Sequence, residues 1–191
     1  MLEDIFISKV RVKILQLFFA TPNQIYHVRE IVRRVGEEIN AVRRELARLE
    51  KAGLLTSEWR ANRRLYSTRQ DYIFWQDLLS VVAKTVGLGG DIVKNRNKIG
   101  KIKFSFLSGA FARGIEVGPN DVDLLVVGNI IMPQIAALVK DEEARRGREI
   151  NYTIMTEEEF NFRKKRRDPF LLGILEKPQI MLIGDEAEML K

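Results

Sequence analysis

The chain has 191 residues, of which 46% are hydrophobic and 30% charged, a balance typical of a globular protein with one or two domains. Cysteine is absent and His27 is the single histidine. This excludes disulfides, thiolate zinc sites, iron–sulfur clusters and a cysteine nucleophile, and it disfavours catalysis that needs histidine as a base. No run of apolar residues reaches the length of a membrane span, and Glu3 and Asp4 stand where a signal peptide carries positive charge. We therefore expect a cytoplasmic protein with no membrane partner.

The positive charge is distributed unevenly along the chain. Residues 1–70 hold 14 Lys and Arg against 8 Asp and Glu, whereas residues 71–191 hold 18 of each, so the whole formal net charge of +6 lies in the first third. A basic module joined to a neutral one indicates that a polyanion binds the first of them.

The first seventy residues read as three short helices followed by a hairpin. Apolar spacing predicts helices over about 10–18, 28–35 and 38–52, the first ended by Pro22 and the other two by Gly36 and Gly53. His27 opens the second helix, where a capping or packing role is expected. Two extended runs, 54–59 and 65–67, flank a polar turn and form a β-hairpin pattern. Trp59 and Trp75 are expected to be packing anchors.

This order of helices and hairpin is the winged helix-turn-helix arrangement, a DNA-binding module. The third helix packs inward through Ile39, Val42, Leu46 and Leu49, and its opposite face is polar and basic. Arginine and asparagine there are suited to contacts with base edges, while the other arginines would touch phosphate. The expected base-reading residues are Asn40, Arg43 and Arg44, and the expected phosphate contacts are Arg48, Arg60, Arg63 and Arg64. The alternative is a solvated basic helix on an ordinary helical core.

Residues 71–90 are predicted to be a linker. An amphipathic helix covers 72–86, and the glycine-rich run 87–90 marks the boundary of the second domain. The apolar stripe of this helix is either core packing or a dimer seam, and we expect a homodimer because many such DNA-binding modules bind paired half-sites.

Residues 91–191 alternate between strands and helices. Strands are predicted at about 102–107, 122–127, 150–154 and 180–183, with helices over 133–146, 156–166 and 168–175. This pattern predicts an α/β domain with a mixed sheet, so the chain as a whole belongs to the α+β class.

Two features of this second domain could support chemistry. Asp121 and Asp123 lie two apart on a predicted strand, which would direct both carboxylates to one face and favour a divalent metal. Upstream, a turn at Gly109 and Ala110 offers backbone N–H groups to a phosphate, and Arg113 could add a charge-assisted contact.

The run from Phe106 to Val127 resembles the minimal nucleotidyltransferase signature of the DNA polymerase β-type superfamily. The matching residues are Gly109, Ala110, Ala112-Arg113-Gly114 and Asn120-Asp121-Val122-Asp123-Leu124. The whole chain is similar to prokaryotic ArsR-like winged-helix regulators fused to a nucleotidyltransferase-like domain. The resemblance implies that Asp121 and Asp123 are catalytic Mg²⁺ ligands, and that Gly109, Ala110, Arg113 and Gly114 hold a nucleoside triphosphate.

The signature is incomplete at three positions. Ala110 replaces the usual hydroxyl or glycine, and Asn120 replaces the usual serine. The position on the third strand that carries a third carboxylate in active members is Asn151, a neutral and poorer magnesium ligand. Glu149 would substitute only if the register of that strand slipped.

The sequence therefore predicts a DNA-binding transcriptional regulator with three parts. A winged helix-turn-helix occupies 1–70, a linker helix 71–90, and a degenerate nucleotidyltransferase-like domain 91–191. The alternative is an active metal-dependent nucleotidyltransferase that moves a nucleotidyl group from a triphosphate to a hydroxyl acceptor.

Overall fold

The computed structural model describes residues 8–116, 118 and 121–191. Glu3, Asp4 and Asn120, named above, lie outside the described residues. The chain divides into two compact units, Met1–Val82 and Ala83–Lys191. Both contain helices and a sheet, so the α+β class is confirmed, and the second sheet is mixed as expected. Over the described ranges, no helix has the length and apolar character needed to cross a bilayer.

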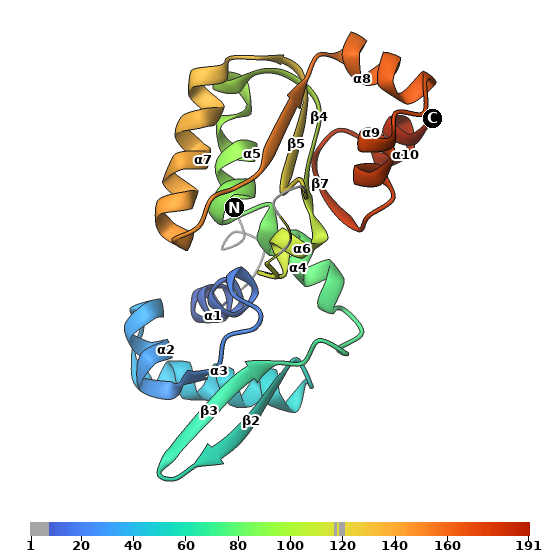
Figure 1. The fold of residues 1–191 in the computed structure, drawn as a ribbon. Helices are drawn as coiled ribbons and strands as arrows, with labels where there is room; N and C mark the ends of the chain where they lie inside the picture. Colours follow the sequence, from blue (N-terminus) through green and yellow to red (C-terminus); the bar gives the residue numbers. More distant parts are fainter. Residues whose placement is uncertain (1–7, 117, 119–120) are drawn as a thin grey trace. The chain divides into compact units, whose positions relative to one another are not determined.

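Unit 1 is built from three helices that precede a small antiparallel sheet (Figure 1). The helices are α1 (Lys9–Ala20), α2 (Val28–Val35) and α3 (Ile39–Lys51). The sheet has the order β1-β3-β2, with β1 (Tyr26–His27), β2 (Leu55–Arg60) and β3 (Arg63–Thr68). The hairpin and the three predicted helices are present, while the short strand β1 was not predicted. A further helix, α4 (Trp75–Ala83), is shorter than the expected 72–86.

Local capping explains where the helices of unit 1 begin. The Nδ1 atom of His27 accepts a hydrogen bond from the Glu30 backbone at 3.3 Å, which confirms the expected capping role. The Glu38 carboxylate accepts from the backbone N–H groups of Asn40 and Ala41 at 2.8 and 2.9 Å. These two bonds, of which the one from Asn40 has the larger effect, hold the pKa of Glu38 below its ordinary value. Gly36 ends α2 in the left-handed region, with φ of 65°.

The core of unit 1 fills the space between the helices. Of the four residues of α3 predicted to face inward, Val42, Leu46 and Leu49 are buried and Ile39 is half-buried. Trp75 is also buried and its ring packs at 6.0 Å from that of Phe19, so it is the expected anchor. Trp59 is not a packing anchor, because its side chain lies on the hairpin with 69% of its surface exposed.

Unit 2 is a four-stranded sheet with helices on both faces. The strands β4 (Gly100–Ser108), β5 (Leu124–Ile130), β6 (Tyr152–Met155) and β7 (Gln179–Ile183) have the order β6-β5-β4-β7. β5 pairs antiparallel with β4 and parallel with β6, and β7 pairs antiparallel with β4.

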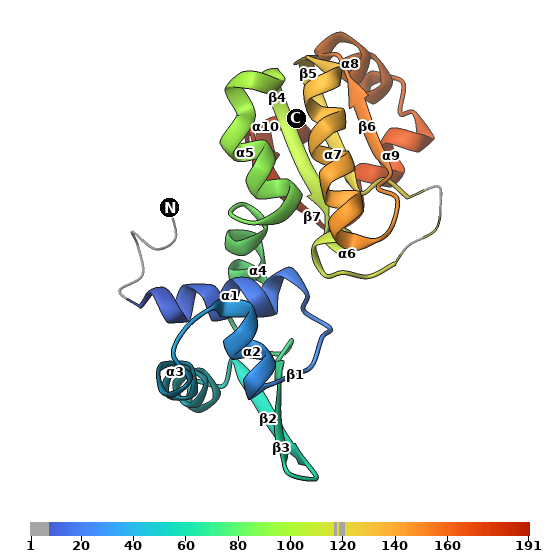
Figure 2. The same cartoon turned by 90° about the vertical axis from the view of Figure 1, so that its left-hand side faces the viewer.

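The alternation of side chains along β5 creates two cores. Leu124 and Val126 pack against α5 (Gly87–Ile99) and α7 (Met132–Arg146). Leu125 and Val127 face the other way, toward α8 (Glu157–Lys165), α9 (Pro169–Leu175) and α10 (Glu186–Leu190). Figures 1 and 2 show the two groups of helices on opposite sides of the sheet. Because the four residues Leu124–Val127 are each covered on one face or the other, this part of β5 is a continuous apolar run.

Two sequence predictions about unit 2 are wrong. The glycines at 87–90 do not form a linker but the first turn of α5, where Gly89 and Gly90 lie too close to the backbone of Ala83 and Thr85 to carry a side chain. Asp121 and Asp123 are not on a strand, because β5 begins only at Leu124. A turn holds Asp121 off the sheet: its N–H donates to the Gly118 carbonyl at 3.0 Å, and its carboxylate accepts from the Gly118 N–H at 3.2 Å.

Candidate nucleic-acid interface and candidate nucleotide site

The acidic residues described between 8 and 70 are all engaged in internal contacts. Glu38 caps α3, and the other five form ion pairs within unit 1. These pairs are Glu30–Arg34, Glu37–Lys13, Glu45–Arg11 with Arg48, Glu50–Arg64 and Glu58–Arg60. The acidic groups are therefore neutralised by a defined subset of the cations.

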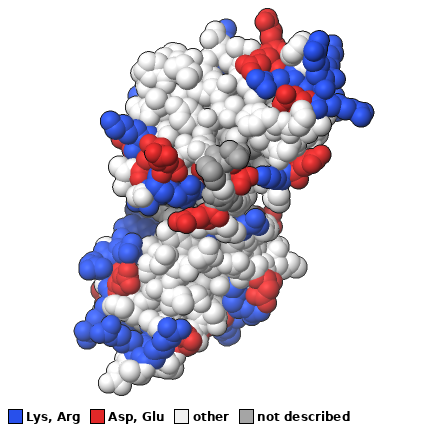
Figure 3. Space-filling model, in the orientation of Figure 1, with Lys and Arg blue, Asp and Glu red and all other residues white. Residues whose placement is uncertain are grey.

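Six further cations lie on α2, α3 and the hairpin. Among the described residues, no ion pair involves Arg29 or Arg33 of α2, Arg43, Arg44 or Lys51 of α3, or Arg63 of β3, and all six residues are exposed. Figure 3 shows blue side chains on both edges of unit 1, with some red ones among them. Unpaired, exposed guanidinium groups keep their full charge and donors for an external anion.

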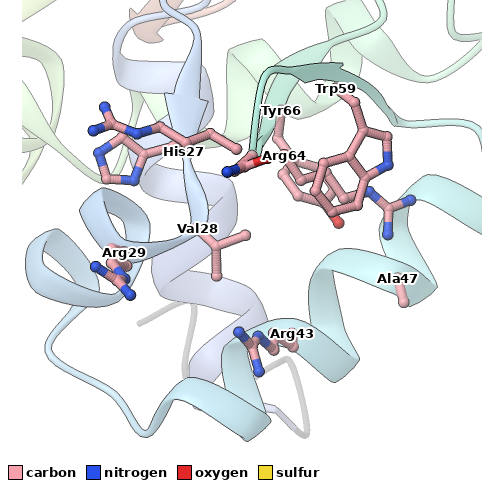
Figure 4. Close-up of a pocket in the computed structure, with 10 residues that line it drawn as sticks. His27, Val28, Arg29, Arg43, Ala47, Trp59, Arg64 and Tyr66 are labelled. Carbon is pink, nitrogen blue, oxygen red and sulfur yellow. The ribbon is translucent and has the colours of Figure 1, made fainter.

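Part of this region is a groove of about 730 Å³ between α2, α3 and the hairpin (Figure 4). It is lined by His27, Val28, Arg29, Arg43, Ala47, Trp59, Asn62, Arg63, Arg64 and Tyr66. Three of the seven residues predicted to bind DNA line it, namely Arg43, Arg63 and Arg64. The exposed side chains of Asn40, Arg44, Arg48 and Arg60 lie outside the lining.

Arg64 has a structural partner in addition to its place in the groove. Its Nη2 atom donates to both carboxylate oxygens of Glu50, at 3.0 and 2.8 Å, and its Nε atom donates to the Ser57 hydroxyl at 2.9 Å. The guanidinium also lies 5.3 Å from the centre of the Tyr66 ring. Burial is the main cause that raises the pKa of Tyr66 above its ordinary value. Arg64 thus ties the hairpin to α3 and fixes one wall of the groove.

The aromatic part of the groove was missed by sequence reasoning. Trp59 was expected to be a buried packing anchor. The sequence pattern of the hairpin does not show which face of the hairpin is exposed and which is packed. Trp59 pairs with Arg64 across β2 and β3, and Arg60 pairs with Arg63 at the end of the ladder. The register of the hairpin therefore places Trp59 beside arginines. An exposed indole ring next to guanidinium groups is suited to stacking with nucleobases and sugars.

In unit 2, each aspartate of the motif has a cation as its partner. Asp121 forms an ion pair with Lys177, and this hydrogen bond is the main cause that lowers the pKa of Asp121. Asp123 is fully buried, and its carboxylate accepts from Arg148 at 3.2 and 3.4 Å and from the Asn151 backbone at 3.2 Å. Among the described residues, no three His, Cys, Asp or Glu side chains are grouped so as to hold a metal ion.

The glycine turn is also engaged internally. The Gly109 N–H donates to the Pro178 carbonyl at 2.7 Å, so it is not directed at a ligand. Ser108 caps the short helix α6 (Gly109–Ala112), where its hydroxyl accepts from the Phe111 N–H at 3.1 Å. Ala110 and Arg113 are half-buried, and Gly114 is exposed with φ of 65°. The Gly109 N–H is therefore bound within unit 2, and nucleotide binding by this turn stays a prediction.

Asn151, which was expected on the third strand, lies one residue before β6 and beside Asp123. The Asn151 carbonyl accepts from the backbone N–H groups of Asp123 and Leu124, at 2.7 and 3.3 Å. Two cavities, of about 230 and 540 Å³, adjoin Asp121, Val122 and Phe170. Arg148, the partner of Asp123, was missed, although a buried aspartate next to an apolar strand requires a cation or several donors.

Comparison of the chain with protein-family models, curated proteins and solved structures finds no match.

Proposed function

We propose that the chain is a DNA-binding transcriptional regulator that binds duplex DNA through unit 1, as a winged helix-turn-helix. In this proposal α3 is the recognition helix and the β2–β3 hairpin is the wing. One observation carries it: the acidic residues described between 8 and 70 are satisfied internally, and the surplus arginines are exposed on α2, α3 and the hairpin. Duplex DNA is a polyanion whose major groove admits one helix, which fits this distribution of charge.

The contacts of each arginine separate the proposed roles. Arg43 and Arg44, with Asn40, are exposed on α3 and are proposed to read base edges. Arg63 is exposed beside the hairpin turn and is proposed to contact phosphate. Arg64 is proposed to position the hairpin, because Glu50 and Ser57 already occupy its Nη2 and Nε atoms.

The test compares Arg43→Ala with Arg63→Ala in the full chain. Duplexes selected from a random library would be titrated by fluorescence anisotropy, together with an unselected duplex. Arg43→Ala is expected to lower the preference for the selected sequence by about ten- to a hundredfold, since a bidentate base contact is worth about 1–3 kcal/mol. Arg63→Ala is expected to weaken both duplexes equally. Identical behaviour of the two variants would contradict the assigned roles.

For unit 2 we propose a nucleotidyltransferase-like fold that catalyses no transfer. The support is that Asp121 and Asp123 are each neutralised by a cation of the chain, Lys177 and Arg148, while the Gly109 N–H is bound to Pro178. Incubation with labelled nucleoside triphosphates and Mg²⁺ or Mn²⁺ tests this proposal. Incorporation of label that Asp121→Ala abolishes would overturn it and would establish the alternative, an active nucleotidyltransferase.

A further inference from the structure

A second group of basic residues lies on unit 2, at the junction of α8 and α9. The sequence Arg163-Lys164-Lys165-Arg166-Arg167 ends α8. The first two residues serve the fold: Arg163 pairs with Glu159 at 2.9 Å and with Asp168 at 3.6 Å, and the Lys164 ammonium donates to the Met189 carbonyl at 2.6 Å. The other three, Lys165, Arg166 and Arg167, are exposed and form no ion pair within the described part of the chain. We call these three residues the basic turn.

The backbone of the basic turn is fixed by hydrogen bonds. The Asp168 N–H donates to the Arg163 carbonyl at 3.0 Å, and the Arg167 N–H donates to the Lys164 carbonyl at 3.1 Å. These two bonds form a Schellman motif at the end of α8. The Asp168 carboxylate then caps α9 by accepting from the Leu171 N–H at 3.0 Å. The three cations are therefore presented on a defined backbone.

Arg167 occupies the position of this motif that favours glycine. Its φ is 52°, and among the described residues the one other non-glycine residue with positive φ is Ala61 in the hairpin turn. A side chain in the left-handed region destabilises the fold relative to glycine, which is the usual residue at this position of a Schellman motif. Within the described part of the chain, the Arg167 side chain forms no hydrogen bond, ion pair or ring contact that would offset this cost. An arginine at a position where it weakens the fold points to a role outside the fold.

Exposed aromatic rings accompany the basic turn. The side chains of Phe162 and Phe170 are 57% and 44% exposed, and the Arg166 guanidinium lies 4.7 Å from the centre of the Phe162 ring. Stacking on an aromatic face holds the guanidinium in one orientation and leaves its N–H groups directed outward. Figure 3 shows blue side chains gathered on the side of unit 2 that carries α8.

We propose that the basic turn is a second phosphate-contacting surface, which binds the sugar–phosphate backbone of duplex DNA. Two of its three cations are arginines, whose planar fork matches the oxygens of a phosphodiester. An anionic membrane is the less favoured partner, because the Arg166 guanidinium lies against the Phe162 ring and would have to enter the lipid together with it. The choice of duplex DNA rests on the function proposed for unit 1, whereas the evidence for a phosphate surface is independent of it.

The variant Arg167→Gly provides the sharpest test, because folding and binding should change in opposite directions. Glycine relieves the left-handed strain, so the Tm of unit 2 is expected to rise by a few degrees (roughly 2–4 °C). One lost phosphate contact lowers the steepness of the plot of log affinity against log salt by about 0.9. At 0.15 M salt this corresponds to roughly a fivefold weaker affinity for an unselected duplex. Replacing Lys165 and Arg166 by Gln as well should lower the steepness by about 2–3 in total.

A charge-matched control replaces Lys94, Lys98 and Lys140 by Gln. These exposed residues lie on α5 and α7, which cover the opposite face of the sheet, so affinity should change little. The proposal would be overturned if Arg167→Gly stabilised the protein without weakening DNA binding. It would also be overturned if the triple control variant weakened DNA binding as much as the triple variant of the basic turn. Loss of binding to phosphatidylserine vesicles, with DNA binding intact, would identify a membrane surface instead and equally overturn it.

The same titrations separate this proposal from the proposed function. If Arg63→Ala leaves DNA binding unchanged while the variants of the basic turn weaken it, the function proposed for unit 1 fails and the basic turn stands. The reverse result would leave unit 1 as the DNA-binding part and refute the basic turn. A full chain that does not bind duplex DNA at all would overturn both.

Discussion

Glu45 offers a prediction whose size can be worked out from its contacts. It is buried on α3, with 5% of its surface exposed, and its carboxylate accepts from Arg11 Nε of α1 at 2.8 Å and from Arg48 Nη1 at 2.6 Å. Glu45→Gln keeps the volume and one acceptor oxygen but removes the charge. Each charge-assisted hydrogen bond is worth about 1.5–3 kcal/mol, and the loss is reduced because the buried carboxylate no longer has to be desolvated. We expect unit 1 to be destabilised by about 1–2 kcal/mol.

The pH dependence of this effect has a defined sign. Burial raises the pKa of Glu45, but the hydrogen bonds from Arg11 and Arg48 outweigh it, so the pKa lies below its ordinary value of 4.5. A lowered pKa in the folded state means that the carboxylate stabilises the fold above pH 4.5, and that this stabilisation is lost as the pH falls through the folded pKa. The difference in stability between wild type and Glu45→Gln should therefore be full at pH 7 and should shrink below pH 4.5.

The assay is urea unfolding followed by tryptophan fluorescence, since the two tryptophans, Trp59 and Trp75, both lie in unit 1. The exposed Trp59 would be replaced by Phe in both proteins, so that the signal comes from buried Trp75. Equal stability of the two proteins at pH 7, or a difference that grows as the pH falls, would refute the reasoning. Affinity for duplex DNA should not fall in Glu45→Gln, because the change removes a negative charge from a basic surface.

Three further predictions concern single contacts. Arg64→Met should weaken duplex binding several-fold, measured by anisotropy, because the hairpin loses its bonds to Glu50 and Ser57; undiminished affinity would contradict its positioning role. Gly109→Ala should destabilise unit 2 by about 1–3 kcal/mol, because the new Cβ atom would lie 2.9 Å from the Pro178 carbonyl oxygen. Gly173→Ala, on the open side of α9, should instead stabilise unit 2 by up to about 1 kcal/mol. Calorimetry that finds Gly109→Ala more stable than Gly173→Ala would refute this reasoning. Asp123→Asn should cost unit 2 about 2 kcal/mol in chemical unfolding followed by circular dichroism, since Arg148 loses a buried partner, and an unchanged midpoint would show that this ion pair is not stabilising.

The helices and strands were largely predictable because their local signals agree. In unit 1, helix caps and hydrophobic spacing point to the same boundaries, and α2 covers the predicted 28–35. In unit 2, the apolar runs identify the strands because both faces of the sheet are covered. The glycines of α5 misled the prediction, since glycine-rich runs usually interrupt helices. In α5, glycine is required at positions 89 and 90, because the backbone at Ala83 and Thr85 leaves no room for a Cβ atom there.

The candidate sites were less predictable, because their properties depend on partners distant in sequence. The sequence identified the exposed arginines of α3, but it could not show that Arg64 is held by Glu50, 14 residues away. It also identified the two aspartates, but not their cations, because Lys177 lies 56 residues from Asp121 and Arg148 lies 25 residues from Asp123. Such pairing depends on how the ends of several elements meet, for which local patterns carry no signal.

The most direct test of the central claim is the salt dependence of duplex binding by the wild-type full chain. Five exposed arginines without ion pairs within the described residues are available to phosphates and bases on unit 1, namely Arg29, Arg33, Arg43, Arg44 and Arg63. Engagement of most of them predicts that log affinity falls against log salt with a slope of about −3 or steeper. A slope near zero, or no binding at low salt, would contradict the account, because the surplus positive charge of unit 1 would then have no phosphate partner.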